Sequence, residues 1–339
     1  MSGADNVLLK IKDLRTSFRI DGQFYAAVDG VDLTVYKDEV LAIVGESGCG
    51  KTAMALSLVR LHNMTYTRME GEILFDGQDI LSLKLPYLNK VRGKDIGFIF
   101  QDPLSALNPL HKIGKQIEET LFYHTDMTDS ERRARALELL QSVGMADPEL
   151  TYNQYPHELS GGMRQRAMIA IAISAKPELL IADEPTTALD VTIQAQILDL
   201  IRDLKKEMKT SIILITHDLG VVAEMADRVA VMYGGQVVEC APVEEIFANP
   251  QHPYTRSLLH SIPGVASMEG NRLHTIHGTV PDLRTMPRHG CRFALRTPWM
   301  PDYAHEDEPT YHFINENHYV LCTCYKTFEF SDEKVGGVD

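Results

Sequence analysis

The chain has 339 residues, and 33 lysines and arginines against 47 aspartates and glutamates give it a formal net charge of −14. This length suggests two domains, or one large domain with an appendage. Hydrophobic residues make up 44% of the chain and charged residues 24%, which supports a full core and excludes a disordered polymer. The acidic balance argues against an independent nucleic-acid binder, because phosphate backbones require a basic surface.

The N-terminal segment and the cysteines favour a protein of a reducing compartment. Residues 1–6 lack the positive and apolar regions of a secretory signal, and no apolar run approaches the ~20 residues needed to span a bilayer. The five cysteines are odd in number and follow no small-scaffold disulfide spacing. We therefore expect free thiols, and we expect any membrane attachment to come through a partner.

The hydrophobic pattern predicts an α/β fold with two kinds of sheet. Residues 7–35 and 71–76 alternate apolar and polar side chains, which indicates an antiparallel subdomain with one face in water. Short, continuously apolar runs indicate strands buried on both faces, at residues 40–44, 96–100, 179–182, 212–215 and 229–233. Helical patterns lie between them, at residues 53–60, 164–175 and 193–207. This alternation predicts a parallel central sheet.

Two further regions depart from that alternation. Residues 103–175 are predicted to be a helical subdomain, in which Thr128 and Glu131 form a capping box. Prolines recur beyond residue 250 and preclude long regular helices there. We therefore predict a first domain over residues 1–250 and a small irregular C-terminal domain over residues 251–339.

A phosphate-binding loop follows the first buried strand. The segment is Gly45-Glu46-Ser47-Gly48-Cys49-Gly50-Lys51-Thr52, a complete G-x-x-x-x-G-K-[ST] motif between a strand and a helix. Its glycines allow backbone N–H groups to surround phosphate oxygens, and the helix directs its positive end at the same anion. Lys51 would contact the terminal phosphates of ATP, and the Thr52 hydroxyl would bind Mg²⁺.

Two carboxylates end the predicted strand at residues 179–182. Asp183 is placed to hold Mg²⁺, and Glu184 is placed to orient and deprotonate an attacking water. An acidic loop start would explain these residues equally well in isolation, but the phosphate loop favours the functional interpretation. The pair resembles the Walker B element and catalytic glutamate of ABC-type ATPases.

A narrower motif strengthens this resemblance. The segment Leu159-Ser160-Gly161-Gly162-Met163-Arg164-Gln165 matches the ABC signature, and it is a helix N-terminus suited to an anion. A serine cap alone would not explain the tandem glycines. In ABC ATPases the signature clamps the nucleotide of the other subunit, so the resemblance implies a head-to-tail pair.

Further residues resemble the remaining ABC elements in their usual order. Gln101 resembles the glutamine that touches Mg²⁺ and the attacking water, Ala188-Leu189-Asp190 resembles the D-loop, and His217 resembles the switch histidine at the γ-phosphate. An aromatic residue that stacks on adenine should precede the phosphate loop. Phe18, Phe24 and Tyr25 all qualify, and we favour Phe18, although each could equally be a core residue.

The tail resembles that of peptide importers within this family, beginning with Asn249-Pro250-Gln251-His252-Pro253-Tyr254-Thr255. Many such ATPases carry four cysteines for an iron–sulfur cluster, whereas this chain has Cys291, Cys322 and Cys324, with Thr297 near one expected position and His305 near another. Three thiols with His305 or His318 could bind zinc or a cluster. Small buried thiols are the commoner case, so we expect no metal in the tail.

The resemblance implies an ATP-hydrolysing subunit that powers bacterial peptide import. Its implied partners are a second ATPase subunit, often a different chain, two transmembrane permease subunits and, indirectly, an extracellular peptide-binding protein. It would lie peripherally at the cytoplasmic face of the membrane. The alternatives are a soluble ABC ATPase of DNA repair or translation, a GTPase switch, which would need a guanine-reading motif, and a degenerate partner, which would lack Glu184 or His217.

Overall fold

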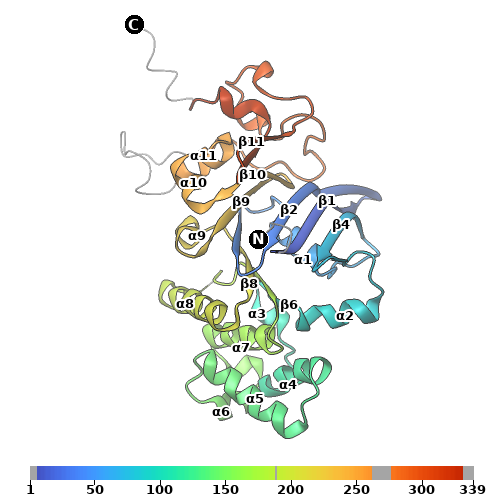
Figure 1. Ribbon diagram of the computed structural model, residues 1–339, viewed down its shortest axis with the longest axis vertical. Coiled ribbons are helices and arrows are strands. Elements are labelled where there is room, and N and C mark those ends of the chain that lie inside the picture. The colour runs from blue at the N-terminus through green and yellow to red at the C-terminus, as the bar shows by residue number, and fades with distance from the viewer. Residues whose placement is uncertain (1–5, 188, 262–275, 331–339) are drawn as a thin grey trace.

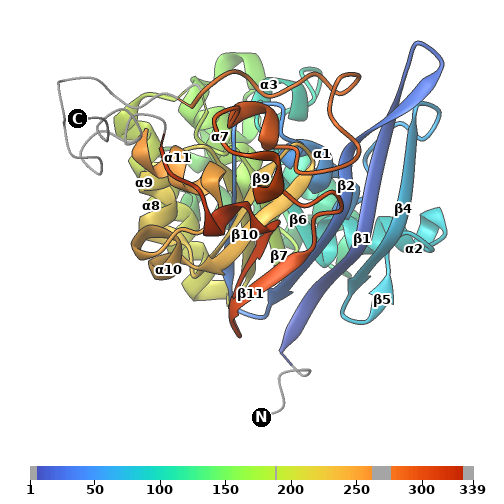
Figure 2. The same ribbon diagram turned by 90° about the horizontal axis from the view of Figure 1, so that it is seen from above.

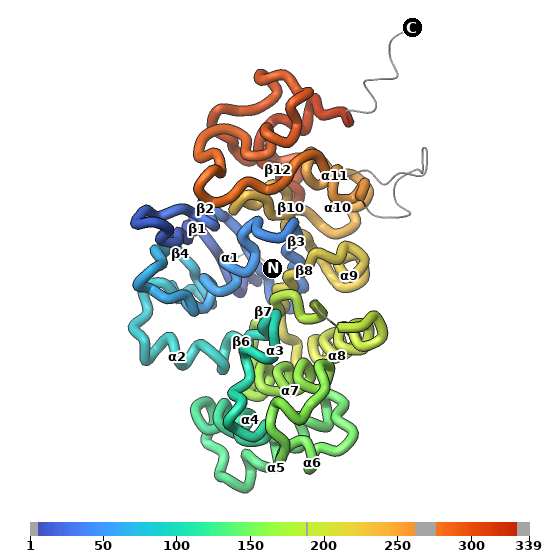
Figure 3. The backbone as a smooth tube through the Cα atoms, turned by 180° about the vertical axis from the view of Figure 1, so that it is seen from behind, coloured from blue at the N-terminus to red at the C-terminus, as the bar shows by residue number. Residues whose placement is uncertain are grey.

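The computed structural model describes residues 6–187, 189–261 and 276–330. Ala188 of the predicted D-loop and residues 262–275 and 331–339 of the tail fall outside these ranges. Figures 1 and 3 show an elongated molecule with helices α4 to α6 at one end, two sheets in the middle and the tail at the other end.

The larger sheet has the buried parallel strands that the apolar runs predict. Its order is β11-β12-β10-β9-β3-β8-β7-β6, and β9, β3, β8, β7 and β6 pair in parallel. The strands are β3 (Val40–Val44), β6 (Ile96–Ile99), β7 (Leu179–Asp183), β8 (Ser211–Thr216), β9 (Arg228–Tyr233), β10 (Gln236–Pro242), β11 (Tyr311–Asn315) and β12 (His318–Leu321). Every residue of β3, β7 and β8 is buried, as a sheet covered on both faces requires.

The smaller sheet is antiparallel, in the order β2-β1-β4-β5. It consists of β1 (Val7–Ile20), β2 (Gln23–Tyr36), β4 (Thr67–Phe75) and β5 (Gln78–Asp79). Helix α1 (Lys51–Leu58) packs against it, and buried hydroxyls of Thr16 and Ser57 share a hydrogen bond of 2.8 Å. Helix α2 (Leu85–Lys94) then leads to β6.

The helical subdomain lies between β6 and β7, over the range that the sequence predicts. It contains α3 (Pro103–Ala106), α4 (Ile113–His124), α5 (Asp129–Ser142), α6 (Pro148–Asn153), the 3-10 turn Pro156–Glu158 and α7 (Gly161–Ile173). The predicted capping box is present at the start of α5. The remaining helices of the described chain are α8 (Val191–Met208), α9 (Leu219–Met225), α10 (Val243–Ala248) and α11 (Pro253–His260). Among the described residues, no helix has the length and apolar composition needed to cross a membrane.

The tail continues the central sheet instead of packing as an isolated unit. Strand β12 pairs antiparallel with β10, and β11 lies beyond it (Figure 2). One hydrophobic cluster joins Val44 and Tyr233 of the parallel sheet to Cys291 and Phe293 of the tail. The chain leaves this sheet at Pro242 and returns to it at β11, and the hydrophobic core continues into the tail. The division at residues 250 and 251 stays a prediction.

Candidate nucleotide site

The phosphate loop connects β3 to α1, and its backbone conformation favours glycine at two positions. Gly50 has a φ of 105°, and a Cβ there would lie 2.4 Å from the carbonyl oxygen of Ala27. Gly48 also has a positive φ, of 80°. No side chain caps the N-terminus of α1, so its first N–H groups stay free for an anion.

Lys51 is fixed inside this loop. Its Nζ donates hydrogen bonds to the carbonyl oxygens of Gly45, at 2.8 Å, and Glu46, at 3.0 Å. The residue is only 5% exposed, so a positive charge lies beside the free N–H groups of α1. Loop, lysine and helix N-terminus together fit a polyphosphate.

Oxygen ligands for a hard cation meet at the start of α1. The Thr52 hydroxyl donates to Asp183 Oδ1 at 3.2 Å. Burial raises the pKa of the Asp183 carboxyl above its usual value, and the Thr52 hydrogen bond opposes that shift. A nearby cation would favour the ionised form. Thr52 and Asp183 therefore offer the oxygen donors that Mg²⁺ prefers.

Glu184 is held at the same edge of the sheet by three side chains. Its Oε2 accepts hydrogen bonds from Gln101 Nε2 at 3.0 Å and Thr187 Oγ1 at 2.8 Å, and His217 Nδ1 lies 3.6 Å away. Its backbone has an uncommon φ of 46°. The structure thus brings Gln101, Glu184 and His217 together, as the sequence predicts for three catalytic residues.

Lys51, Thr52, Gln101 and Glu184 line one cleft of about 440 Å³. Its walls include residues of the phosphate loop, Gln101, Glu184 and Ala27. The tail supplies the remaining wall, over residues 280–283. A cleft with a phosphate cradle, an oxygen ligand set and an oriented carboxylate can bind a nucleoside triphosphate and direct water at it.

Comparisons with known proteins agree with this geometry. The family model described as ABC transporter matches residues 28–187, and the model for the oligopeptide/dipeptide transporter C-terminal region matches residues 238–299. The oligopeptide transport ATP-binding protein OppD of Lactococcus lactis is 49% identical over 97% of this chain and 98% of its own length. The protein of that name in Bacillus subtilis is 52% identical over 92% of this chain and 87% of its own length.

The chain belongs to the ABC transporter family. Its structure resembles a post-hydrolysis dimer of the ATP-binding cassette MJ0796 bound to ADP and phosphate, with a TM-score of 0.63 and 31% identity over 70% of this chain and 99% of that one. The predicted family and the predicted α/β fold with antiparallel and helical subdomains are therefore confirmed.

The ABC signature forms the N-terminus of α7. The Ser160 hydroxyl accepts a hydrogen bond from the Met163 N–H at 3.3 Å, and Ser160 and Gly161 are exposed. A Cβ on Gly161 would meet nothing within 4 Å, and its φ is not positive. Neither backbone conformation nor packing within the described chain explains this glycine. Neither Ser160 nor Gly162 lines the cleft of its own chain.

Asp190 and Cys49, two further residues of the predicted site, have structural roles. Asp190 caps α8 by accepting a hydrogen bond from the Ile193 N–H at 3.0 Å, whereas its D-loop neighbour Ala188 lies outside the described residues. Cys49 is buried within the phosphate loop, and burial raises the pKa of its thiol. It therefore acts as an uncharged spacer in the loop.

The structure does not place Phe18 in the nucleotide cleft. Its ring packs edge-on against His62, with centroids 5.2 Å apart, and His62 Nε2 lies 2.8 Å from the carbonyl oxygen of Ala53 in α1. Phe24 and Tyr25 do not line the cleft either, although Ala27, two residues after Tyr25, does. The adenine-stacking role of Phe18 therefore stays a prediction.

The tail contacts the phosphate loop, which sequence reasoning missed. Arg296 has a side chain that is 2% exposed and forms an ion pair with Glu46. The Tyr254 hydroxyl accepts a hydrogen bond from the Glu46 N–H at 2.7 Å, and burial raises the pKa of Tyr254, so the phenol stays neutral. The motif around Tyr254 was visible in the sequence, but nothing local indicates a partner 208 residues away.

Proposed function

We propose that this chain binds and hydrolyses ATP to power the import of peptides through a bacterial ABC transporter. Relatives named for oligopeptide transport, about half identical over nearly the whole chain, support this assignment, and so does the match of the tail to the oligopeptide/dipeptide transporter region. The soluble ABC ATPase of repair or translation is not favoured, because those relatives and that tail belong to transporters.

In this proposal each residue of the cleft has a separate role. Lys51 and the N–H groups of the phosphate loop bind the phosphates, while Thr52, Asp183 and Gln101 hold Mg²⁺. Bound Mg²⁺ would neutralise charge on the phosphates. Glu184 orients a water and accepts its proton, and His217 contacts the γ-phosphate.

The exposed signature carries the proposal of a paired ATPase. Gly161 has open space around it and an ordinary φ, so its lack of a side chain serves a group that approaches from outside. The N-terminus of a 13-residue helix lies directly behind it. We expect that group to be the nucleotide of a second ATPase subunit, either a different chain or a copy of this one.

The helical subdomain offers a surface for the permease subunits. It exposes the large apolar side chains Leu104, Leu110, Phe122 and Tyr123, of which Leu110 is 80% exposed. Exposed apolar side chains that gather on one subdomain are typical of a protein partner. Leu104 also follows Gln101 by three residues, so movement at this surface would reach the cleft. The chain would then lie at the cytoplasmic face of the membrane, with an extracellular peptide-binding protein as an indirect partner.

Two experiments test this function. Affinity purification from detergent-solubilised membranes should recover two multi-span subunits and a second ATPase in stoichiometric amounts. In that complex, Gly161→Leu should abolish ATP hydrolysis, while ATP affinity and folding of the isolated chain stay unchanged. Ser130→Leu, an exposed position in the first turn of α5, is the matched control and should keep full activity. A soluble chain without partners would contradict the transport assignment.

A further inference from the structure

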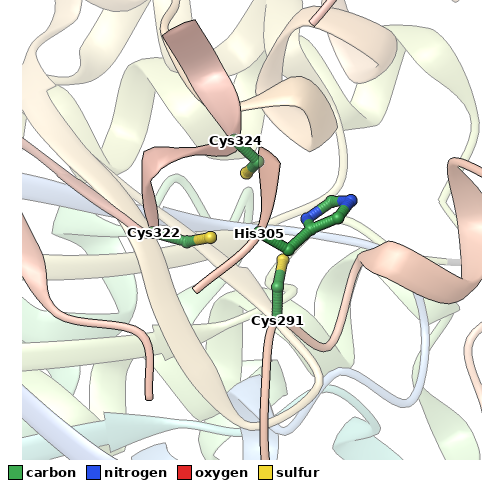
Figure 4. Close-up of side chains that lie close together, drawn as sticks. All are labelled: Cys291, His305, Cys322 and Cys324. Carbon is green, nitrogen blue, oxygen red and sulfur yellow. The ribbon is translucent and has the colours of Figure 1, made fainter. Parts of the chain in front are cut away.

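Four potential metal ligands converge in the tail. The sulfur atoms of Cys291, Cys322 and Cys324 and a ring nitrogen of His305 all lie within 4.8 Å of one another. Figure 4 shows the three cysteines and His305 close together, drawn from separate stretches of the tail. Cys291, Cys322 and Cys324 are 8%, 1% and 0% exposed. The site lies outside the nucleotide cleft and has no role in the chemistry described above.

The spacing of these atoms matches a tetrahedral zinc ion. Zinc binds thiolate sulfur at about 2.3 Å and imidazole nitrogen at about 2.0 Å, so a regular tetrahedron places its ligand atoms about 3.5–3.8 Å apart. Four atoms contained within 4.8 Å need only small rotations to reach that arrangement. An iron–sulfur cluster interposes several iron and sulfide atoms between its thiolates, and this compact group leaves no room for them.

The imidazole of His305 is unsatisfied within the described chain. Both of its ring nitrogens are buried from solvent and have no hydrogen-bond partner among the described residues. A buried polar atom without a partner costs free energy, so such an atom needs an explanation. A metal bond to one ring nitrogen of His305 provides that explanation.

The backbone at Cys322 supports the same interpretation. This residue has φ 71° and ψ 149°, close to a region that is essentially reserved for glycine. Strained conformations of this kind persist where the surroundings hold them, and they gather at functional sites. Here the strain turns the chain so that Cys322 and Cys324 both face Cys291.

Groups around the cluster are arranged to support thiolates. The backbone N–H of Glu306 donates to Cys322 Sγ at 3.4 Å. His252 accepts the Tyr254 N–H at Nδ1, at 3.1 Å, which leaves its proton on Nε2, and Nε2 lies 4.0 Å from Cys324 Sγ. Donors aimed at the sulfur atoms are what the outer shell of a metal site requires.

We propose that Cys291, His305, Cys322 and Cys324 bind one Zn²⁺ ion as a structural site. On binding, the three thiols each release a proton and neutral His305 donates a nitrogen lone pair. Three thiolates and Zn²⁺ then carry a net charge of −1. The backbone N–H of Glu306 and the ring N–H of His252 face this negative charge. The set of three sulfurs and one nitrogen, with no open position, is typical of structural zinc. This proposal departs from our expectation of a metal-free tail.

The zinc site would hold the tail against the nucleotide cleft. It joins residue 291, residue 305 and the segment 322–324, and the segment after Cys291 carries two arginines toward the first domain. Arg292 forms an ion pair with Asp29 of β2, and Arg296 forms one with Glu46 of the phosphate loop. Fixing Cys291 therefore fixes both contacts.

The direct test is metal analysis of the full-length purified chain. We expect about one zinc per chain in the native protein, and loss of that zinc in Cys291→Ser, Cys322→Ser and His305→Ala. Cys240→Ser is the matched control, since Cys240 is equally buried but stands outside the cluster, and it should retain the metal. Zinc content is measured without ATP hydrolysis. Its result therefore tests the zinc site independently of the proposed transport function.

A second measurement covers variants that do not fold. His305→Cys preserves four ligands and should keep stoichiometric zinc, and Co²⁺ exchanged into the native chain should give the intense visible absorption of a tetrahedral thiolate site. Native protein without metal, with titration showing free thiols or a disulfide, would overturn the proposal. Iron with acid-labile sulfide in place of zinc would overturn it as well.

Discussion

The nucleotide cleft and the C-terminal tail are assembled by different rules. In the cleft, functional residues follow directly after buried parallel strands: the phosphate loop after β3, Glu184 after β7 and His217 after β8. In the tail, residues meet from irregular segments, and the metal ligands span Cys291 to Cys324 with only short strands between them.

The difference shows what makes a site readable in a sequence. Parallel pairing places Val44 beside Thr216 and Asp183 beside Ile215, so the residues that follow these strands must share one edge of the sheet. The clustered residues of the tail do not follow paired parallel strands. Its geometry depends on packing against the finished core, and no spacing within the tail encodes that packing.

The largest expected effect breaks the chemistry of the cleft and leaves the tail intact. Glu184→Gln removes the group that accepts the proton of the attacking water, and turnover should fall by ~10²- to 10⁴-fold. ATP affinity should stay near the native value, because Lys51 and the phosphate loop are unchanged. Steady-state hydrolysis by the assembled complex and equilibrium ATP binding measure the two quantities.

Glu178→Gln is the matched control for that experiment. Glu178 is exposed just before the other end of β7, away from the nucleotide, and its substitution should leave turnover unchanged. Equal hydrolysis by Glu184→Gln and the native chain would remove Glu184 from the mechanism.

The second prediction targets the anchor of the tail. His318 and Glu239 are both 0% exposed and share a hydrogen bond of 2.8 Å, and Glu239 also accepts the N–H groups of Gln251 and His252. His318→Ala leaves a buried carboxylate without its cationic partner, so stability should fall by about 3–5 kcal/mol. Denaturant unfolding measures this fall in the free energy of unfolding. His312→Ala breaks a half-exposed pair with Glu306 and should cost less than about 1 kcal/mol.

The same pair predicts a pH dependence. Burial disfavours the charged imidazole, but Glu239 and Glu245 outweigh that effect and raise the pKa of His318 above its usual value. Its stabilisation is therefore complete below the unfolded-state pKa of about 6.5 and is lost as pH rises through the higher folded-state pKa. His318→Gln should flatten this fall in stability, and an unchanged pH profile would contradict the pairing.

These contrasts also explain how far the sequence could predict the molecule. The strands, the helical subdomain, the phosphate loop and the convergence of Gln101, Glu184 and His217 were predictable, because each depends on local pattern or on parallel register. The Arg296–Glu46 contact was not, because 250 residues separate its partners and no periodicity links them. The sequence offered His305 and His318 as alternative partners of the three tail cysteines and could not choose between them, for the same reason.

The aromatic candidates upstream of the phosphate loop pose a different problem. The β1–β2 hairpin has a bulge here, because Thr16 pairs with Val28 and Ser17 with Ala26, which leaves Ala27 of β2 as the extra residue. One extra residue in a strand turns the following side chains to the opposite face. Counting along the sequence cannot reveal this bulge, so the three aromatic candidates could not be separated without the structure.

Substitution of each aromatic residue separates the candidates. Tyr25→Ala should weaken ATP binding by about 1–3 kcal/mol, roughly 5- to 150-fold, which is the scale of stacking between an aromatic ring and a base. Phe18→Ala should leave the ATP affinity of the folded protein unchanged. Tyr25→Phe keeps an aromatic ring and should have near-native ATP affinity. Titration with ATP measures all three. A loss with Phe18→Ala alone would reverse the assignment.

The smallest effect concerns the helical subdomain, where a purely local signal was enough. The Thr128 side chain accepts the Glu131 N–H, and Glu131 accepts the Thr128 N–H at 2.7 Å, so the start of α5 depends on four consecutive residues and not on distant contacts. Thr128→Ala should cost about 1 kcal/mol, while Thr128→Ser keeps the hydroxyl and should cost a few tenths. Hydrogen exchange should show the loss confined to α5, with ATP affinity and tail metal content unchanged. Faster exchange in the tail would mean that this helix start, too, depends on distant packing.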